Sequence, residues 1–219
     1  MSDIFREIDE DMRRERMGEL WKKYGSWVVA AAVLVVLATA GWRGYEFWRS
    51  REAQAAGARF EKALEAARDN KEAEAEKQFA EIAADAPGGY RILPRLRGAA
   101  EISKRDPDAG VAAWRAVAGD SGVGSVLQDL ARARVGYLLV DKVAYADLAK
   151  EIEGLTAASN PWRNAARELL GVSALKAGDL TNAGKWFDQI VADREAPANM
   201  RKRAEDFLGF VAGGAVRTQ

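Results

Sequence analysis

An uncharged stretch of 19 residues, from Tyr24 to Trp42, constrains this chain more than any other feature. As an α-helix it is about 28 Å long, close to the hydrocarbon thickness of about 30 Å of a bilayer. Trp21 and Trp27 lie near its first end, and Trp42 and Trp48 lie near its second. Aromatic residues in these places are typical of the interfaces that flank a membrane-spanning helix. The sequence therefore predicts a transmembrane helix over residues 24–42.

The same stretch could instead form a buried helix of a soluble core or belong to a cleaved signal peptide. Core helices seldom stay free of charge for so long or carry aromatic residues at both ends. Ala38-Thr39-Ala40 resembles a cleavage site, and cleavage there would leave a protein that begins at Gly41. However, the preceding 23 residues contain six Arg or Lys and seven Asp or Glu, unlike the short basic start of a signal peptide. We therefore favour an uncleaved span.

Residues 1–23 show the apolar periodicity of an amphipathic helix, with charged residues between the apolar ones. The apolar positions are Ile4, Phe5, Ile8, Met12, Leu20, Trp21 and Tyr24. Such a segment lies on the membrane surface or extends the spanning helix, and the alternative is a small cytoplasmic docking element. We expect the first of these.

The composition excludes several kinds of chemistry. The chain contains neither Cys nor His, so disulfides, thiol nucleophiles and histidine-based triads are impossible, and no cofactor or metal site is expected. The 33 basic residues balance the 33 acidic ones, which gives no reason to expect nucleic-acid binding. Only acid–base chemistry by carboxylates, or chemistry by Lys, Ser or Tyr, remains for an enzyme.

Residues 43–214 predict an all-α domain, followed by a short tail over residues 215–219. Alanine-rich segments with helical periodicity alternate with short Gly, Asp or Pro breaks, and no segment alternates as a strand does. Helices of roughly 12 to 20 residues with such short connections form helix hairpins. The breaks lie at Asp69-Asn70, Ala86-Pro87-Gly88-Gly89, Asp106-Pro107, Gly119-Asp120-Ser121-Gly122, Asp141-Lys142, Ser159-Asn160-Pro161, Gly178-Asp179 and Ala196-Pro197.

A small residue recurs four positions before a large apolar one in alternate helices. The pairs are Ala75 and Phe79, Gly110 and Trp114, Ala144 and Leu148, and Ala183 and Phe187. A small side chain lets two helices approach closely, and the large one fills the space between consecutive hairpins. The pattern resembles the tetratricopeptide repeat, most closely in the last unit with Leu170-Gly171. This resemblance implies a right-handed α-solenoid of about four hairpins.

The layout of the whole chain resembles the YfgM-like ancillary subunits of the Sec translocon. Its most similar local motif is GELWKKYG, Gly18 to Gly25, directly before the uncharged stretch. The resemblance implies a single-pass protein of the bacterial inner membrane with a cytoplasmic N-terminus and a periplasmic repeat domain. It also implies association with the SecYEG channel and with periplasmic chaperones that meet emerging proteins.

The positive-inside rule alone does not decide this orientation. Six Arg or Lys lie within about 20 residues of the span on its N-terminal side, and five lie on the other side. Long downstream domains are translocated largely regardless of their charge, so a periplasmic repeat domain is compatible with this count.

The predicted function is therefore a membrane-anchored protein-binding scaffold, which is not an enzyme. One alternative is a secreted or lipid-facing adaptor of another envelope complex with the same repeats. Another is a carboxylate-based cell-wall enzyme, with Glu72 and Glu76 or Glu101 and Asp106 as its acid–base pair, but no oxyanion motif or nucleophile elbow accompanies them. Ala40 and Gly44 have the spacing of a small-residue helix contact, so self-association is also possible.

The first helix of each hairpin is expected to present side chains to a concave, protein-binding surface. The predicted positions are Arg95, Ala99, Ile102, Asp129, Ala133, Tyr137, Glu168, Val172 and Lys176. A second set is expected to pack the repeats together: Ala75, Phe79, Gly110, Trp114, Leu148, Leu170, Gly171, Ala183 and Phe187.

Overall fold

A computed structural model describes the backbone of residues 2–217 and the side chains of residues 21–214. The chain divides into two compact units, Met1–Ala55 and Ala56–Gln219, and the second is the repeat domain. The first helix, α1 (Ser2–Arg68), contributes to both units.

In the first unit, α1 exposes every residue of the uncharged stretch except Gly25, which is buried. Every residue from 26 to 52 is exposed, including Trp27, Leu34 and Trp42. Within residues 21–214, α1 is the one helix that is long and apolar enough to cross a membrane. The helix continues without interruption through the predicted boundaries of the span. The predicted amphipathic pattern of residues 1–23 falls mostly on side chains outside the described ones.

The repeat domain is built from helices joined by short turns. After α1, the elements are α2 (Glu72–Asp85), η1 (Gly88–Arg91), α3 (Ile92–Arg105), α4 (Pro107–Ala118), α5 (Ser125–Leu139), α6 (Tyr145–Ile152), η2 (Glu153–Thr156), α7 (Arg163–Lys176), α8 (Leu180–Ala192) and α9 (Ala198–Arg217). The described residues include no strand.

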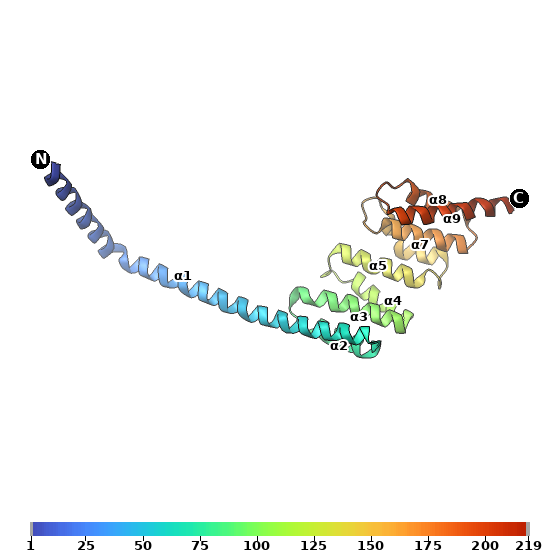
Figure 1. The fold of residues 1–219 in the computed structure, drawn as a ribbon, viewed down its shortest axis with the longest axis horizontal. Helices are drawn as coiled ribbons and strands as arrows, with labels where there is room; N and C mark the ends of the chain where they lie inside the picture. Colours follow the sequence, from blue (N-terminus) through green and yellow to red (C-terminus); the bar gives the residue numbers. More distant parts are fainter. Residues whose placement is uncertain (1, 218–219) are drawn as a thin grey trace. The chain divides into compact units, whose positions relative to one another are not determined.

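Consecutive helices pack in pairs, and the pairs stack along the domain (Figure 1). The end of α1 packs on α2, and α3 with α4, α5 with α6, and α7 with α8 form the next hairpins. Each hairpin also contacts the next, since α2 packs on α3 and α4 on α5. A hairpin buries only part of its apolar surface internally, so this stacking produces a continuous core.

Local sequence explains where several helices begin and end. The Asp106 carboxylate accepts hydrogen bonds from the backbone N–H groups of Asp108 and Ala109, and Pro107 follows as the first residue of α4. Asp179 caps α8 in the same way, and Gly178 before it has a φ of +74°, which favours glycine. These are positions at which the sequence predicts breaks.

The third hairpin departs from the predicted helix length. Its second helix, α6, has only eight residues and is followed by the 3₁₀ turn η2. Ala144 lies before α6 as its exposed N-cap, whereas Leu148 is fully buried. The expected minimum of about 12 residues is therefore wrong for this helix. Shortening α6 leaves room for η2 to contact α7.

Glycines allow close approach inside two hairpins. A Cβ atom on Gly110 would lie 2.7 Å from the Cα of Ser103 in α3, and one on Gly171 would lie 2.8 Å from the Phe187 ring in α8. Real Cβ atoms do not come so close to other atoms. A larger residue at either position would therefore push the two helices apart.

The last helix, α9, covers the end of the stack. Phe207 lies with its ring stacked on that of Phe187, and the ring centroids are 4.8 Å apart. Ala204 is buried against the same cluster. A repeat array needs such a terminal helix, because its last hairpin would otherwise expose an apolar face.

Candidate protein-binding surface

The first helices of three successive hairpins, α3, α5 and α7, are joined at their N-terminal ends. The Arg95 Nη1 lies 2.5 Å from the Asp120 carboxylate, in the loop before α5. The Trp162 Nε1 donates to the Val126 carbonyl over 3.2 Å, which connects the start of α7 to the start of α5. These contacts place the starts of the first helices on the same edge of the domain.

On α3, the three predicted binding residues line a groove of about 430 Å³. Arg95 and Ile102 are partly exposed in it, and Ala99 is buried. The groove is floored by α3 and walled by α2 and α4, the second helices of two hairpins. Its other lining residues are Glu76, Phe79, Ala80, Ala83, Ala84, Pro94, Gly98, Ala113, Ala116 and Val117.

The groove is mainly apolar because alanine and other apolar residues form most of its lining, and its two charged residues, Glu76 and Arg95, are each paired within the chain. Glu76 accepts from the Arg105 guanidinium at 2.7 Å, and Arg95 is bound to Asp120. The Asp120 carboxylate has its pKa held below the usual range by Arg95 and by the backbone N–H of Gly122. The binding prediction did not include the alanines of the walls. The spacing of these alanines along α2 and α4 was the sequence signal that could have indicated them. In the structure, Ala80, Ala84 and Ala116 are exposed.

The three predicted residues on α5 differ in their surroundings. Asp129 accepts hydrogen bonds from Arg132 and Asn160, and Ala133 is buried. Tyr137 is 49 % exposed and is the one large apolar side chain of the three that reaches solvent. Only Tyr137 therefore has a broad surface available for a partner.

On α7, the predicted residues contact other parts of the chain. Arg203 of α9 donates two hydrogen bonds to Glu168, at 2.7 and 3.0 Å, and Val172 packs against the cluster that includes α9. Lys176 is exposed and donates to the Asp141 carboxylate at 2.5 Å. The C-terminal helix therefore occupies much of the surface that the prediction left open on this hairpin.

The residues expected to pack the repeats all lie in the interior. They are Ala75, Phe79, Gly110, Trp114, Leu148, Leu170, Gly171, Ala183 and Phe187, and each is buried. The Trp114 Nε1 also donates to the Ser103 hydroxyl at 3.1 Å, so its ring is oriented as well as buried. In the described structure these residues form part of the helix interfaces.

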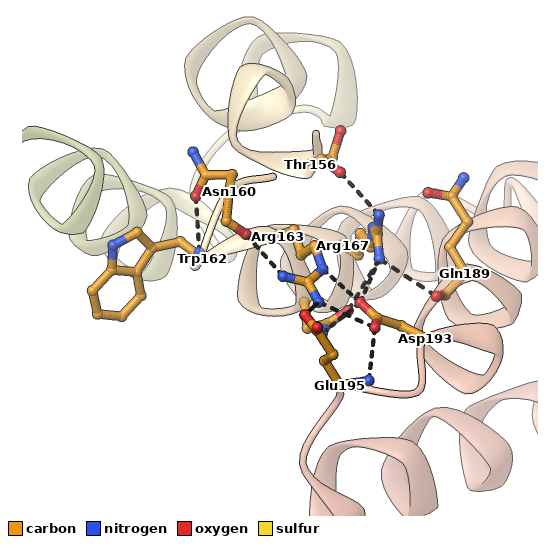
Figure 2. A network of polar contacts seen from close by, with 9 residues as sticks. Thr156, Asn160, Trp162, Arg163, Arg167, Gln189, Asp193 and Glu195 are labelled. Atoms are coloured by element: carbon orange, nitrogen blue, oxygen red, sulfur yellow. Dashed lines mark hydrogen bonds and ion pairs between the residues drawn. The ribbon is translucent and has the colours of Figure 1, made fainter. Parts of the chain in front are cut away.

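A dense polar network joins α7 to the end of α8 (Figure 2). Arg163 donates to both oxygens of Asp193, at 2.6 and 3.1 Å, and Arg167 reaches the same carboxylate at 3.3 Å. Asn164 donates to it as well. Arg163 bonds Glu195 too, and Arg167 donates to the backbone carbonyls of Thr156 and Gln189.

The charges of this network perturb one another. Hydrogen bonds from Arg163 hold the pKa of Asp193 well below its usual range, although desolvation opposes the shift. The pKa of Arg163 is raised by Asp193 and Glu195. Burial lowers the pKa of Arg167, and the Asp193 charge opposes that effect. The network is a structural one, because each charged group in it is bound by another part of the chain.

Three of the four carboxylates considered for acid–base catalysis, all except Glu72, make structural contacts. Glu76 is bound by Arg105, and Glu101 is buried and bound by Lys104 at 2.6 Å. Asp106 caps α4. Over residues 21–214, no group of three or more acidic residues is arranged to hold a metal ion. Each of these three carboxylates therefore already has a partner within the chain.

Comparison with known sequences identifies the repeat architecture. The sequence pattern of the Tetratricopeptide repeat-like domain matches residues 19–204, which is most of the chain. No curated protein and no solved structure matches this sequence. The family match confirms the predicted all-α fold and agrees with the stacked hairpins of the structure.

Proposed function

Because the chain belongs to the tetratricopeptide repeat-like domain family, we propose that it is a membrane-anchored scaffold that binds other proteins. Domains of this family are generally non-catalytic and mediate protein–protein interactions. Recognition, rather than bond-making chemistry, is the proposed mechanism. A membrane anchor raises the effective concentration of such a domain near partners in the same membrane.

The observation that carries the membrane part of this proposal is the exposed, uncharged surface of α1. Aromatic residues at its C-terminal end and just after it point in several directions, since Trp42, Tyr45, Phe47 and Trp48 are each more than half exposed and are spread around the helix at 100° per residue. A single protein partner would cover one side of the helix, whereas a lipid interface surrounds it. The distribution therefore favours lipid over a one-sided protein contact.

The compartment and partners are proposed from the resemblance to the YfgM-like subunits. We place the N-terminus in the cytoplasm and the repeat domain in the periplasm of a bacterial cell. There the domain would connect the SecYEG translocon to periplasmic chaperones and emerging proteins. We assign residues 24–42 to the span, residues 1–23 to the cytoplasmic segment, residues 43–214 to the periplasmic domain and residues 215–219 to a tail.

The first prediction concerns anchoring. The full chain is expected to remain with membranes through high-salt and carbonate washing, and to keep its own N-terminus. Leu34→Arg/Leu37→Arg is expected to release much of it, because each charge at the centre of a span costs roughly 2.5–3.5 kcal/mol. The measurement is immunoblotting of washed membranes, with N-terminal sequencing of the retained chain.

The matched control for this experiment is Ser50→Arg, which adds a charge outside the proposed span. It should stay in the washed membranes like the unchanged chain. A soluble protein that begins at Gly41 would instead establish a cleaved signal peptide and disprove the anchor.

The second prediction concerns partners. A photo-reactive residue at the exposed position Tyr137 is expected to crosslink translocon subunits or periplasmic folding factors in intact membranes. The same residue at Asp188, exposed on the second helix α8, serves as the control and should give weaker products. Mass spectrometry of the crosslinked products is the measurement. Recovery of cytosolic proteins alone would reverse the proposed topology.

A further inference from the structure

Three arginines follow the proposed span on α1, and they differ in the charges around them. Arg43, Arg49 and Arg51 are all exposed, and none forms an ion pair among the described side chains. Arg49 lies three residues after Glu46 and three before Glu52, a spacing at which helical side chains are neighbours. Glu46 is also three residues from Arg43, but carboxylates flank only Arg49 on both sides. Arg43 and Arg51 lie on a different side of the helix.

Arg43 and Arg51 share one face of α1 with Phe47. Positions four residues apart are only about 40° apart around a helix, so these three side chains form one line. The guanidinium carbon of Arg51 lies 4.6 Å from the centroid of the Phe47 ring. Ala40 and Gly44 lie on the same side, and a Cβ atom on Gly44 would meet nothing within 4 Å. We define the α1 arginine strip as Ala40, Arg43, Gly44, Phe47 and Arg51.

The stacking of Arg51 on Phe47 holds the Arg51 charge closer to the span than its backbone is. Arg51 follows Arg43 by eight residues, which is about 12 Å along a helix. The headgroup layer on each side of the hydrocarbon core is only roughly 5–8 Å thick. Phe47 lies about 6 Å beyond Arg43, so a guanidinium held over its ring is within that layer. Both arginine charges therefore lie at the depth of the lipid phosphates.

The two charges favour a lipid over a second copy of the chain as the occupant of the strip. Ala40 and Gly44 have the spacing of a helix–helix contact. In a parallel pair of helices joined there, Arg43 of one copy would lie near Arg43 of the other, and like charges repel. An anionic phospholipid instead offers a phosphate to the arginines and an acyl chain to the small residues.

We propose that the α1 arginine strip binds an anionic phospholipid, such as phosphatidylglycerol, in the leaflet at the C-terminal end of the span. The phosphate accepts hydrogen bonds from Arg43 and Arg51, and an acyl chain lies against Ala40 and Gly44. A zwitterionic lipid such as phosphatidylcholine binds more weakly, because its own cation offsets the phosphate charge. The inference rests on the proposed membrane anchor and adds a lipid preference to it.

This preference can be measured by photo-crosslinking from the full chain in vesicles. The vesicles contain equal amounts of phosphatidylglycerol and phosphatidylcholine with the same acyl chains. A photo-reactive phenylalanine analogue at Phe47 probes the strip, and the same analogue at Tyr45 probes another side of the helix at a similar depth. Mass spectrometry of the adducts should show a roughly fivefold preference for phosphatidylglycerol at Phe47 and none at Tyr45. The same preference at both positions would contradict the proposal.

The arginines are tested by Arg43→Gln/Arg51→Gln, which should abolish the preference at Phe47 while the chain stays in the membrane. The matched control is Arg49→Gln/Arg68→Gln, which removes two exposed positive charges outside the strip and should leave the preference unchanged. Equal preferences for these two double variants would overturn the proposal. Chain-to-chain adducts in place of lipid adducts at Phe47 would also overturn it, because a second copy would then occupy the strip.

A third probe separates failure of this inference from failure of the anchor. Leu34 is exposed in the middle of the uncharged stretch, and a photo-reactive residue there should give acyl-chain adducts with both lipids. Lipid adducts at Leu34 without a preference at Phe47 would leave the anchor intact and reject the anionic-lipid site. Absence of lipid adducts at both positions would reject the anchor and the site together.

Discussion

An Asp193→Ala variant of the full chain is expected to lose about 3 kcal/mol of the free energy of unfolding of its repeat domain. The Asp193 carboxylate is 12 % exposed and is shared by Arg163 and Arg167, whose side chains are 13 % and 10 % exposed. Its removal leaves two guanidinium groups between α7 and α8 without their common partner. For a domain of this size the melting temperature should fall by roughly 6–12 °C, measured by circular dichroism.

Asp188→Ala is the matched control for this variant. Asp188 lies on α8 only five residues earlier, is exposed, and forms no ion pair among the described residues. Its replacement should change stability by less than about 0.5 kcal/mol. Equal melting temperatures for the two variants would mean that the network of Figure 2 contributes nothing measurable to stability.

The same network gives the stability a defined pH dependence. The pKa of Asp193 is lower in the folded chain than in the unfolded chain, where it lies near about 3.9. Its contribution is therefore fully present above about pH 4 and is lost as the pH falls toward the folded pKa. The difference in melting temperature between the unchanged chain and Asp193→Ala should shrink below pH 4.

Gly110→Ala is expected to destabilise the repeat domain by roughly 2–3 kcal/mol. The added methyl group would lie 2.4 Å from the Ser103 hydroxyl and 2.7 Å from the Ser103 Cα. A side chain can rotate away, but a backbone atom cannot, so α4 must move from α3. That movement also strains the hydrogen bond between Trp114 and Ser103. Chemical denaturation followed by tryptophan fluorescence measures the loss.

Gly209→Ala provides a control with the opposite sign. Gly209 is an exposed residue of α9, and a Cβ atom there would meet nothing within 4 Å. Alanine should raise stability by about 0.5–1 kcal/mol, because it loses less backbone entropy than glycine on forming a helix. A loss of stability in both variants would show that contact with Ser103 is not the cause.

The Gly110→Ala and Asp193→Ala substitutions are expected to affect the groove on α3 differently. The groove depends on the spacing of α2, α3 and α4, so Gly110→Ala should distort it. The Asp193 network lies between α7 and α8 and should leave the groove intact while the domain is folded. Stability and binding can therefore be separated by comparing the two variants at a temperature below both melting transitions.

The sequence alone was sufficient for the features that depend on local patterns. The uncharged residues 24–42 require an apolar environment wherever they lie, and the spacing of Phe79, Trp114 and Phe187 indicates stacked hairpins. Asp106-Pro107 marks the start of a helix by hydrogen bonding and proline geometry that involve only neighbouring residues. Such signals act within a few residues, so they can be recognised without knowing the rest of the fold.

The third hairpin shows where local patterns are insufficient. The sequence around Leu148 has apolar periodicity, and its nearest stop signal, Gly154, was not among the predicted breaks. The structure ends α6 there and uses η2 to bring the Thr156 carbonyl to Arg167. The short length of α6 therefore depends on packing against α7, which comes later in the sequence and contacts both α6 and η2 in the folded chain.

Tertiary contacts determine whether a surface residue is covered, paired or free. Glu168 and Val172 are four residues apart and lie on one face of α7. In the folded chain, Arg203 of α9 binds Glu168, and Val172 packs against the cluster that includes α9. Arg97 and Arg95 look equivalent in sequence, yet only Arg95 has a carboxylate within reach, supplied by Asp120 25 residues later. A helical pattern states which residues share a face. Whether that face is covered, paired or free depends on segments distant in the sequence, which only the folded chain brings together.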